Sequence, residues 1–145
     1  MSAAADEELR FPDDGDCFGC SRSNPGGLQM RFRRRGARVV SDHVIAEAFH
    51  GAPGIAHGGI VATLLDELSC ATAHFLGGTH VVTGELCVRY ERPVPVETPI
   101  AMQAEIVRTD HPRYLVIEAS IHRDGEVLAR STGKFFRHPG LMDTP

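Results

Sequence analysis

Residues 49–71 read FHGAPGIAHGGIVATLLDELSCA, a loop rich in Pro and Gly followed by a long apolar run. Gly77 and Gly78, a few positions further on, are typical of a helix end. The apolar side chains between the loop and these glycines recur at the spacing of one helix face, at Ile60, Leu64, Leu68, Ala71 and Phe75. The pattern predicts one long helix over about residues 58–76.

Asp66 lies inside this apolar run, where a charge is costly unless it is paired or used. The helix is expected to begin at Gly58 and Gly59, and the first N–H groups of a helix lack internal acceptors and lie at the positive end of its dipole. Such groups can bind an oxyanion. Together with a carboxylate they indicate hydrolysis of a carbonyl compound, with Asp66 as general base or nucleophile. Because Glu67 is the next residue, the pattern alone leaves open which carboxylate is merely solvated.

The spacing of these two groups argues against a site within one chain. Eight positions separate Gly58 from Asp66, roughly 12 Å at the helical rise of about 1.5 Å per residue. A carbonyl bound at the Gly58 N–H is therefore out of reach of the Asp66 side chain of the same chain. Two antiparallel copies of the helix about a two-fold axis would place Asp66 of one chain opposite Gly58 of the other. The sequence predicts a dimer with two composite sites.

Strand patterns flank the helix on both sides. Leu28, Met30 and Phe32 alternate with polar residues, and residues 39–49 are rich in β-branched side chains. Asp124-Gly125 predicts a tight hairpin. Four strand-like runs follow the helix, at residues 80–91, 98–109, 114–123 and 127–137. Six strands and one long helix indicate an α+β domain, with a mostly antiparallel sheet curled around the helix.

Composition and charge limit the possible classes of protein. The chain has 145 residues, of which 42% are hydrophobic, enough for one core and too few for two. We expect one domain over residues 17–137, a flexible tail at 1–16 and a short tail at 138–145. The net charge of -4 and the pI near 6.0 argue against nucleic-acid binding. Residues 1–16, MSAAADEELRFPDDGD, lack the apolar segment of a signal peptide or membrane span, so a cytoplasmic protein is expected.

Three stretches carry a resemblance to a known family. HGGIVATLLDELSCA, residues 57–71, resembles the His-Gly-Gly…Asp motif of hotdog-fold acyl-CoA thioesterases. TGELCVRYERPVP, residues 83–95, is similar to the strand and Arg-Pro turn of the branch that contains the human thioesterase-superfamily enzymes and bacterial phenylacetate-type thioesterases. With CFGCSRSNPGGL near the start, the resemblance covers about residues 17–136. It implies the hotdog fold, an antiparallel six-stranded sheet wrapped around a central helix, in a homodimer that forms a dimer of dimers.

The resemblance assigns roles to four residues. It implies that Asp66 is the catalytic carboxylate and that the Gly58 N–H binds the thioester oxygen, which a residue without a side chain lets approach closely. It implies that Thr83 positions the attacking water, since a hydroxyl both donates and accepts hydrogen bonds; the alternative is an ordinary strand residue. His57 would orient the carbonyl or stabilise the loop, and a lone His beside a turn is more often structural.

Coenzyme A carries phosphates, so its site is expected to include cations. By their positions in the family motif, Arg92, in a turn with Pro93, and Lys134 are expected to bind coenzyme A. Gly59 would contact the substrate at the start of the helix. The alternative for both cations is a solvated side chain. Relatives of the phenylacetate type often carry an Asn before His-Gly-Gly, where this chain has Gly51-Ala52-Pro53-Gly54. That departure weakens any transfer of aryl-acyl specificity.

Cys17-x-x-Cys20 invites a zinc or redox interpretation. A four-ligand zinc site needs two more ligands, and the eight histidines show no pair at the short spacing of zinc ligands. Structural loop cysteines are therefore favoured, and Cys70 and Cys87 are expected to pack as small hydrophobes. We expect no metal and no cofactor apart from the coenzyme A of the substrate.

The sequence thus favours an acyl-CoA thioesterase that releases a carboxylic acid and coenzyme A. An alternative from another class is a hotdog module that binds acyl-CoA without cleaving it, as a sensor or interaction domain. The acidic residue at position 66 argues against it, because a binder gains nothing from a charge beside an acyl tunnel. A hotdog dehydratase ranks last, since His50 and Glu67 do not match the spacing of its His and Glu pair.

Overall fold

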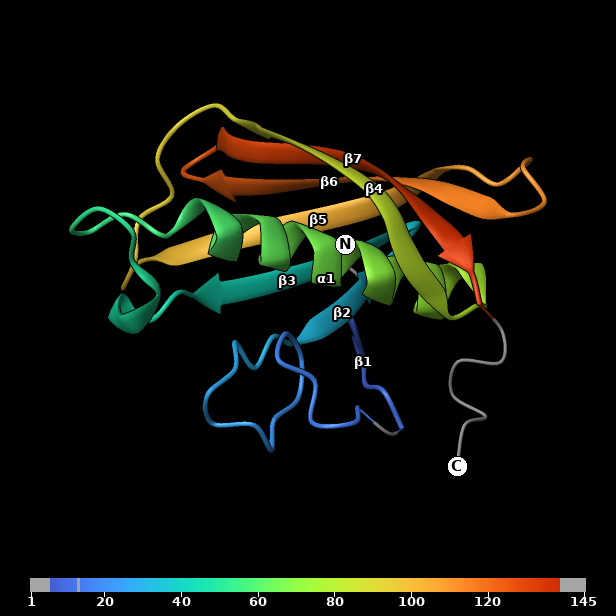
Figure 1. Cartoon of the computed structure of the whole chain (residues 1–145), viewed down its shortest axis with the longest axis horizontal. Coiled ribbons are helices and arrows are strands. Elements are labelled where there is room, and N and C mark those ends of the chain that lie inside the picture. Colours follow the sequence, from blue (N-terminus) through green and yellow to red (C-terminus); the bar gives the residue numbers. More distant parts are fainter. Residues whose placement is uncertain (1–5, 13, 139–145) are drawn as a thin grey trace, which may run out of the picture.

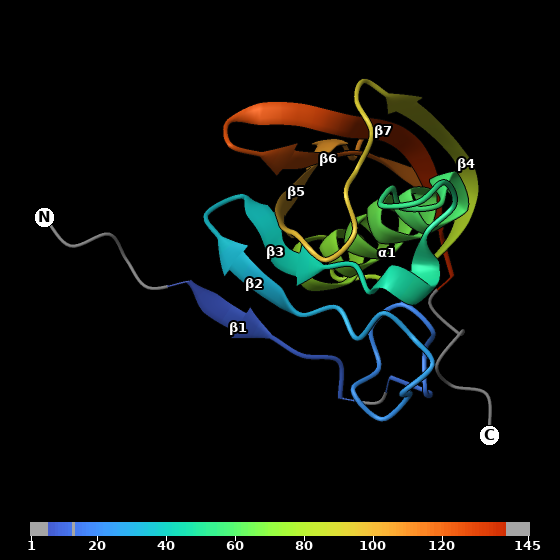
Figure 2. The ribbon, with the colours of Figure 1, turned by 90° about the vertical axis from the view of Figure 1, so that its left-hand side faces the viewer.

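The structure is a computed structural model and describes residues 6–12 and 14–138. One long helix, α1 (Gly58–Gly77), lies in the hollow of a curled antiparallel sheet whose strand order is β1-β2-β3-β5-β6-β7-β4 (Figures 1 and 2). A short 3-10 helix, Glu47–Phe49, precedes α1. The strands are β1 (Glu7–Leu9), β2 (Phe32–Arg35), β3 (Arg38–Val44), β4 (Val81–Tyr90), β5 (Pro99–Arg108), β6 (Tyr114–Arg123) and β7 (Glu126–Arg137).

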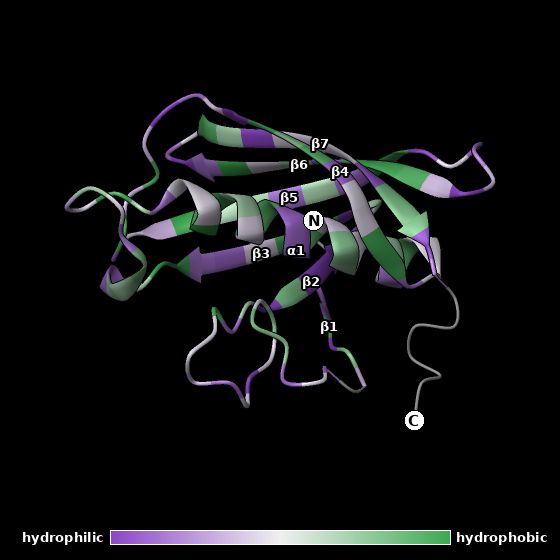
Figure 3. Ribbon diagram, in the orientation of Figure 1, coloured by the Kyte–Doolittle hydropathy of each residue, from purple (hydrophilic) through white to green (hydrophobic). Residues whose placement is uncertain are grey.

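The helix begins and ends as its sequence predicts. His57 adopts an extended conformation and caps the first turn, because its Nδ1 accepts a hydrogen bond of 2.9 Å from the Gly59 N–H. Gly78 ends the helix in the left-handed conformation, at φ 67. Figure 3 shows the alternation of apolar and polar residues along α1 and the strands around it. The buried face of α1 includes Val61, Leu64, Leu65, Leu68 and Ala71.

By length and composition alone, α1 could also cross a membrane, and it is the only such helix among the described residues. The burial of α1 explains its apolar residues without a membrane. Leu64, Leu65 and Leu68 are fully buried and belong to one core with sheet residues such as Ile117 and Phe135. The apolar character of α1 is therefore explained by its position at the centre of the domain.

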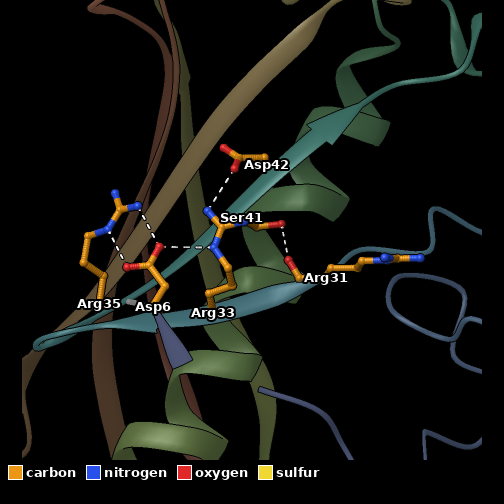
Figure 4. Close-up of polar contacts among 6 residues, drawn as sticks. All are labelled: Asp6, Arg31, Arg33, Arg35, Ser41 and Asp42. Atoms are coloured by element: carbon orange, nitrogen blue, oxygen red, sulfur yellow. Dashed lines mark hydrogen bonds and ion pairs between the residues drawn. The ribbon is translucent and has the colours of Figure 1, made fainter. Parts of the chain in front are cut away.

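The sheet has seven strands instead of the expected six, because β1 adds an edge strand to β2. The expectation of a flexible tail over residues 1–16 is therefore wrong for Glu7–Leu9. Residues 1–5 and 13 lie outside the described residues. Charge pairing holds this segment: Asp6 accepts hydrogen bonds from Arg33 at 3.2 Å and from Arg35 at 2.7 Å (Figure 4). These guanidinium groups, Arg35 foremost, lower the pKa of Asp6.

Two of the expected strands are shorter than predicted. The alternation that begins at Leu28 does not form a strand before Phe32, because Gln29 has a left-handed φ of 53. The N–H groups of Leu28 and Met30 instead donate to Phe18 O at 2.8 Å and Gly19 O at 3.0 Å. The strand expected over residues 39–49 ends at Val44. Residues 17–30 therefore form a loop, which lies near β1 and β2 in Figures 1 and 2 and contacts α1 at Glu67.

The remaining strands lie within one or two residues of their predicted bounds. Asp124 and Gly125 have positive φ values of 51 and 79, as the predicted tight hairpin between β6 and β7 requires. Of the tail expected at 138–145, only His138 lies within the described residues, where its N–H donates to His80 O at 2.8 Å.

Candidate active site

The fold brings two of the predicted site residues into direct contact. The Thr83 hydroxyl donates a hydrogen bond of 2.6 Å to Asp66 Oδ1, and both side chains are half-buried. Asp66 comes from the middle of α1, and Thr83 comes from β4, where it pairs in register with the buried Phe135. The hydroxyl keeps lone pairs that can accept from a water molecule, and the second carboxylate oxygen remains available for a proton.

A β-bulge fixes the position of Thr83. The register between β4 and β7 shifts between Thr83 and Glu85, and the residue between them is Gly84. A Cβ at Gly84 would lie 2.3 Å from the Phe136 ring, so a side chain at this position would displace the ring. The bulge therefore depends on glycine, and it lets the strand present Thr83 to the helix.

The structure separates the two neighbouring carboxylates of α1. Glu67 faces the loop at residues 17–20, where its Oε1 accepts a hydrogen bond of 3.4 Å from Cys17 Sγ. Burial and the Glu67 carboxylate raise the pKa of the Cys20 thiol far above its ordinary range. Glu67 is thus engaged on a different side of the helix from Thr83. Asp66 remains as the carboxylate that faces β4.

The helix N-terminus forms a second part of the candidate site. The Tyr90 hydroxyl donates a hydrogen bond of 2.6 Å to Gly58 O. The Gly59 N–H donates to Nδ1 of His57. Within the part of the chain that the structure describes, the Gly58 N–H has no acceptor, as an oxyanion donor would require. An open cavity of about 310 Å³ adjoins this turn, lined by residues including Phe49, His50, His57, Gly59, Ile60 and Thr63.

These two parts lie at different places along α1, as their spacing predicts. Asp66 and Thr83 lie where β4 crosses the helix, and Gly58 lies two turns earlier, at the end of the helix. β4 is the last strand of the sheet and exposes Val82 (46%) and Tyr90 (51%). The Asp66–Thr83 pair thus lies beside an unpaired sheet edge, which is a surface suited to pairing with another chain.

The residues expected to bind coenzyme A lie in two regions. Arg92 pairs with Glu126 at 3.1 Å, and its turn adjoins the loop that enters α1, because the Ala56 N–H donates to Val94 O at 2.8 Å. Pro93 belongs to the same turn. Lys134 lies over the Tyr114 ring, 5.4 Å from its centre, on the face of the sheet turned away from α1. Its role in binding coenzyme A stays a prediction.

Two neighbours of the site were not predicted from the sequence. Tyr90 carries no signal for its contact with Gly58, which depends on how β4 crosses the helix. Cys70 Sγ lies 3.7 Å from Thr83 Oγ1, and burial raises its pKa to about 12, so its thiol stays protonated at neutral pH. Cys70 packs against the core as expected, but the same expectation for Cys87 is wrong, because Cys87 is exposed. In β4 it pairs with the exposed Thr132, on the outer face of the sheet.

A long central helix wrapped by a curled antiparallel sheet defines the hotdog class of α+β proteins. The model of the thioesterase superfamily matches residues 53–130, more than half of the chain. The chain belongs to the thioesterase superfamily. Its expected fold class is thereby confirmed.

Curated relatives agree with this family. The human acyl-coenzyme A thioesterase THEM5 is 33% identical over 88 residues, which cover 60% of this chain and 35% of the human protein. The acyl-coenzyme A thioesterase THEM4 of Xenopus laevis is 27% identical over 109 residues, 74% of this chain and 49% of that protein. The chain thus matches between about a third and a half of the length of these relatives.

Solved structures share the fold. A thioesterase superfamily protein superimposes with a TM-score of 0.71 at 27% identity, covering 78% of this chain and 56% of the other. A thioesterase superfamily protein of Shewanella loihica PV-4 superimposes with a TM-score of 0.65 at 24% sequence identity, and the match covers 76% of this chain and 91% of the other. A hypothetical thioesterase of Streptococcus pneumoniae TIGR4, crystallised with coenzyme A, superimposes with a TM-score of 0.69 at 21% sequence identity. That match covers 76% of this chain and 86% of the other.

Proposed function

We propose that this protein is an acyl-CoA thioesterase, which hydrolyses an acyl-CoA thioester to a carboxylic acid and coenzyme A. The observation that carries the proposal is the hydrogen bond of 2.6 Å from Thr83 to Asp66, which holds a half-buried carboxylate on the apolar central helix. Membership of the thioesterase superfamily and the relatives named acyl-coenzyme A thioesterases support it. A carboxylate held in this way can act on water or on a carbonyl carbon.

The reaction follows from the groups present. Water attacks the thioester carbonyl carbon while Asp66 takes its proton, or Asp66 attacks first and water hydrolyses the resulting anhydride. The Thr83 hydroxyl orients the carboxylate through Oδ1, which leaves Oδ2 for the reacting partner. Negative charge develops on the carbonyl oxygen, and the Gly58 N–H stabilises it. In the first route the carbon–sulfur bond then breaks, and the sulfur leaves with the proton that Asp66 accepted. In the second route this bond breaks as the anhydride forms, and the sulfur leaves as a thiolate that takes a proton from solvent. No metal or redox cofactor takes part.

We further propose that two chains build each site. The Gly58 N–H that stabilises the oxygen comes from the partner chain, since the Gly58 and Asp66 of one chain lie roughly 12 Å apart along α1. The exposed edge of β4, beside Thr83, is the surface where the two sheets would meet. The cavity at the start of α1 would receive part of the substrate, with Gly59 on its wall and the Arg92-Pro93 turn nearby. A dimer of dimers is the assembly we expect.

The test is thiol release from a panel of acyl-CoAs that differ in chain length and aromaticity. Asp66→Asn keeps the size of the side chain and removes the base, so it should lower the rate by at least about 100-fold while coenzyme A binding survives. Asp124→Asn is the matched control, because it makes the same chemical change in an exposed hairpin whose positive φ Asn tolerates. It should retain the full rate.

The same assay separates the alternative function. Binding of acyl-CoA without hydrolysis in the parent protein would indicate a sensor or interaction module, and the catalytic role of Asp66 would be wrong. An equal rate in the parent and in Asp66→Asn would leave a thioesterase whose base lies elsewhere.

A further inference from the structure

A second cluster of reactive side chains lies outside the proposed active site. Cys17 and Cys20, from the loop at residues 17–30, meet Glu67 of α1, and one sulfur or oxygen atom of each lies within 4.8 Å of the others. We propose that these three side chains bind a zinc ion that fastens the loop to the central helix. The cluster is separate from the Asp66–Thr83 pair, so the ion would join the loop to α1 and take no part in the proposed hydrolysis.

The distance between Cys17 and Glu67 fits tetrahedral zinc, and the Cys20 sulfur lies within 4.8 Å of both. Zinc binds cysteine sulfur at about 2.3 Å and carboxylate oxygen at about 2.1 Å, so a sulfur and an oxygen ligand of a tetrahedral ion lie about 3.6 Å apart. Cys17 Sγ and Glu67 Oε1 lie 3.4 Å apart. Three protein ligands leave the fourth position to a water molecule. Thiolate ligands favour zinc over the hard cations magnesium and calcium.

The backbone of the loop holds Cys17 and Cys20 in place. The Gly19 N–H donates to Cys17 Sγ at 3.3 Å, a contact that stabilises a metal-bound thiolate. The Ser21 N–H donates to Cys17 O at 3.0 Å, which closes the turn between the two cysteines. The Met30 N–H donates to Gly19 O at 3.0 Å and fastens this turn to the end of the loop. The two sulfurs are thus positioned by contacts that need no metal.

Gly19 explains how Glu67 reaches the cysteines. A Cβ at position 19 would lie 2.7 Å from Glu67 Cγ and 2.8 Å from Oε2, which is closer than side chains approach. The displaced atoms belong to the end of a flexible side chain, so an alanine would move the carboxylate without disturbing the helix. Glycine at this position therefore serves the approach of Glu67 to the two sulfurs.

The charges balance when the ion binds. Each thiol releases its proton to solvent and gives its electron pair to the metal, so two protons leave for each zinc bound. Two thiolates and one carboxylate then surround a divalent ion, which leaves one net negative charge. Without a cation, the Glu67 carboxylate shares a half-buried site with two thiols.

The first experiment measures zinc in the intact protein. Protein purified without chelators should contain one zinc per chain by elemental analysis, and chelator-treated protein should rebind one equivalent with release of two protons. Cobalt in place of zinc should give the absorption of a tetrahedral thiolate complex. Failure to bind a stoichiometric zinc ion under reducing conditions would overturn the proposal, as would a native disulfide between Cys17 and Cys20 found by mass spectrometry.

Variants assign the ligands. Cys17→Ser should weaken zinc binding by more than about 100-fold, beyond the loss typical of a residue that only supports a ligand. Gly19→Ala should weaken it by roughly tenfold to 100-fold with little change in melting temperature of the metal-free protein. Cys87→Ser removes an exposed thiol in β4 and should bind zinc like the parent. If Cys17→Ser does not fold, Gly19→Ala still decides, because unchanged affinity in that variant would contradict the geometry.

Discussion

At the scale of single residues, the contact between Thr83 and Asp66 makes a sharp prediction. Thr83→Val keeps the shape of a β-branched residue but removes the hydroxyl that donates to Asp66 Oδ1. The carboxylate loses its orientation and the water loses a partner, so we expect thioester hydrolysis to slow by roughly 10- to 100-fold. Steady-state rates on the best acyl-CoA substrate measure this loss.

Thr83→Ser is the control, because it restores the hydroxyl on a smaller side chain. It should recover most of the parent rate. If the valine variant hydrolyses the substrate as fast as the parent, Thr83 does not position the reacting groups and its contact with Asp66 is only structural.

The sequence predicts Asp66, Gly58 and Thr83 as candidate site residues, but it does not predict the contacts between them. The apolar run marks Asp66 because a charge is costly inside an apolar helix, and the loop before it marks Gly58 as the first residue of the helix, where an N–H lacks an internal acceptor. Thr83 was indicated by family resemblance alone. Whether Asp66 or Glu67 faces the site depends on the rotation of α1 against β4, which no local pattern encodes.

At the scale of elements, the predictable parts are those with a strong local signal. The helix was predicted within one residue because the glycines at its start, its apolar stripe and its terminal glycines agree. β1 was missed because Glu7-Glu8-Leu9 has no alternation of apolar and polar residues. Ion pairs of Asp6 with Arg33 and Arg35 fasten the start of this segment to β2, and no local pattern predicts them. A two-residue period predicted a strand at Leu28, where a left-handed backbone at Gln29 prevents one.

The C-terminal cap of α1 gives a prediction about stability. Gly78 has φ 67 and donates its N–H to His74 O at 3.2 Å, while a Cβ there would meet no atom within 4 Å. Gly78→Ala should therefore cost about 1 kcal/mol through backbone strain alone. Denaturant unfolding measures it. Gly78→Asn should lose less, because Asn tolerates this conformation; equal losses would show that the strain does not come from φ.

The same end of the helix predicts a dependence on pH. His74 stacks near Phe11 and His80, with ring centres 4.7 and 4.6 Å away, and burial, followed by the charge of His80, lowers its pKa below the ordinary 6.5. The unfolded chain therefore takes up this proton more readily, so the stability from neutral His74 is complete above about pH 6.5 and declines below it. Melting temperatures should fall less from pH 7.5 to about 5 in His74→Gln than in the parent. An equal fall would exclude His74 as a cause.

At the scale of the whole molecule, the proposed dimer rests on a spacing that the sequence already contains. Gly58 and Asp66 cannot serve one carbonyl within a chain, and the structure adds the unpaired edge of β4 beside Thr83. The contact surface of the proposed dimer could not be predicted from the sequence, because it would combine the edge of β4 with one side of α1. A composite site makes a prediction that a site within one chain does not: two variants that are inactive alone should regain activity when they form mixed dimers.

Gly58→Pro is the partner for Asp66→Asn in this test. Proline is favoured at the first position of a helix, and His57 already has the extended conformation that must precede it, with ψ 136. The substitution removes the N–H and keeps the helix, so the variant alone should be nearly inactive. Gly58→Ala is its control, since it keeps the N–H and its Cβ would meet only Tyr90, at 3.6 Å. It should lose far less activity than Gly58→Pro, because it keeps the N–H and adds only a methyl group beside the substrate.

Co-expression of the two inactive variants then decides where the groups lie. In a dimer with composite sites, each mixed dimer has one site with both defects and one site with none. With random pairing half of the dimers are mixed, so about a quarter of the parent activity should return. If the activity stays at the level of the separate variants, Gly58 and Asp66 do not act across an interface. The thioesterase proposal would still stand on the Asp66→Asn result, because that test does not depend on which chain supplies the N–H.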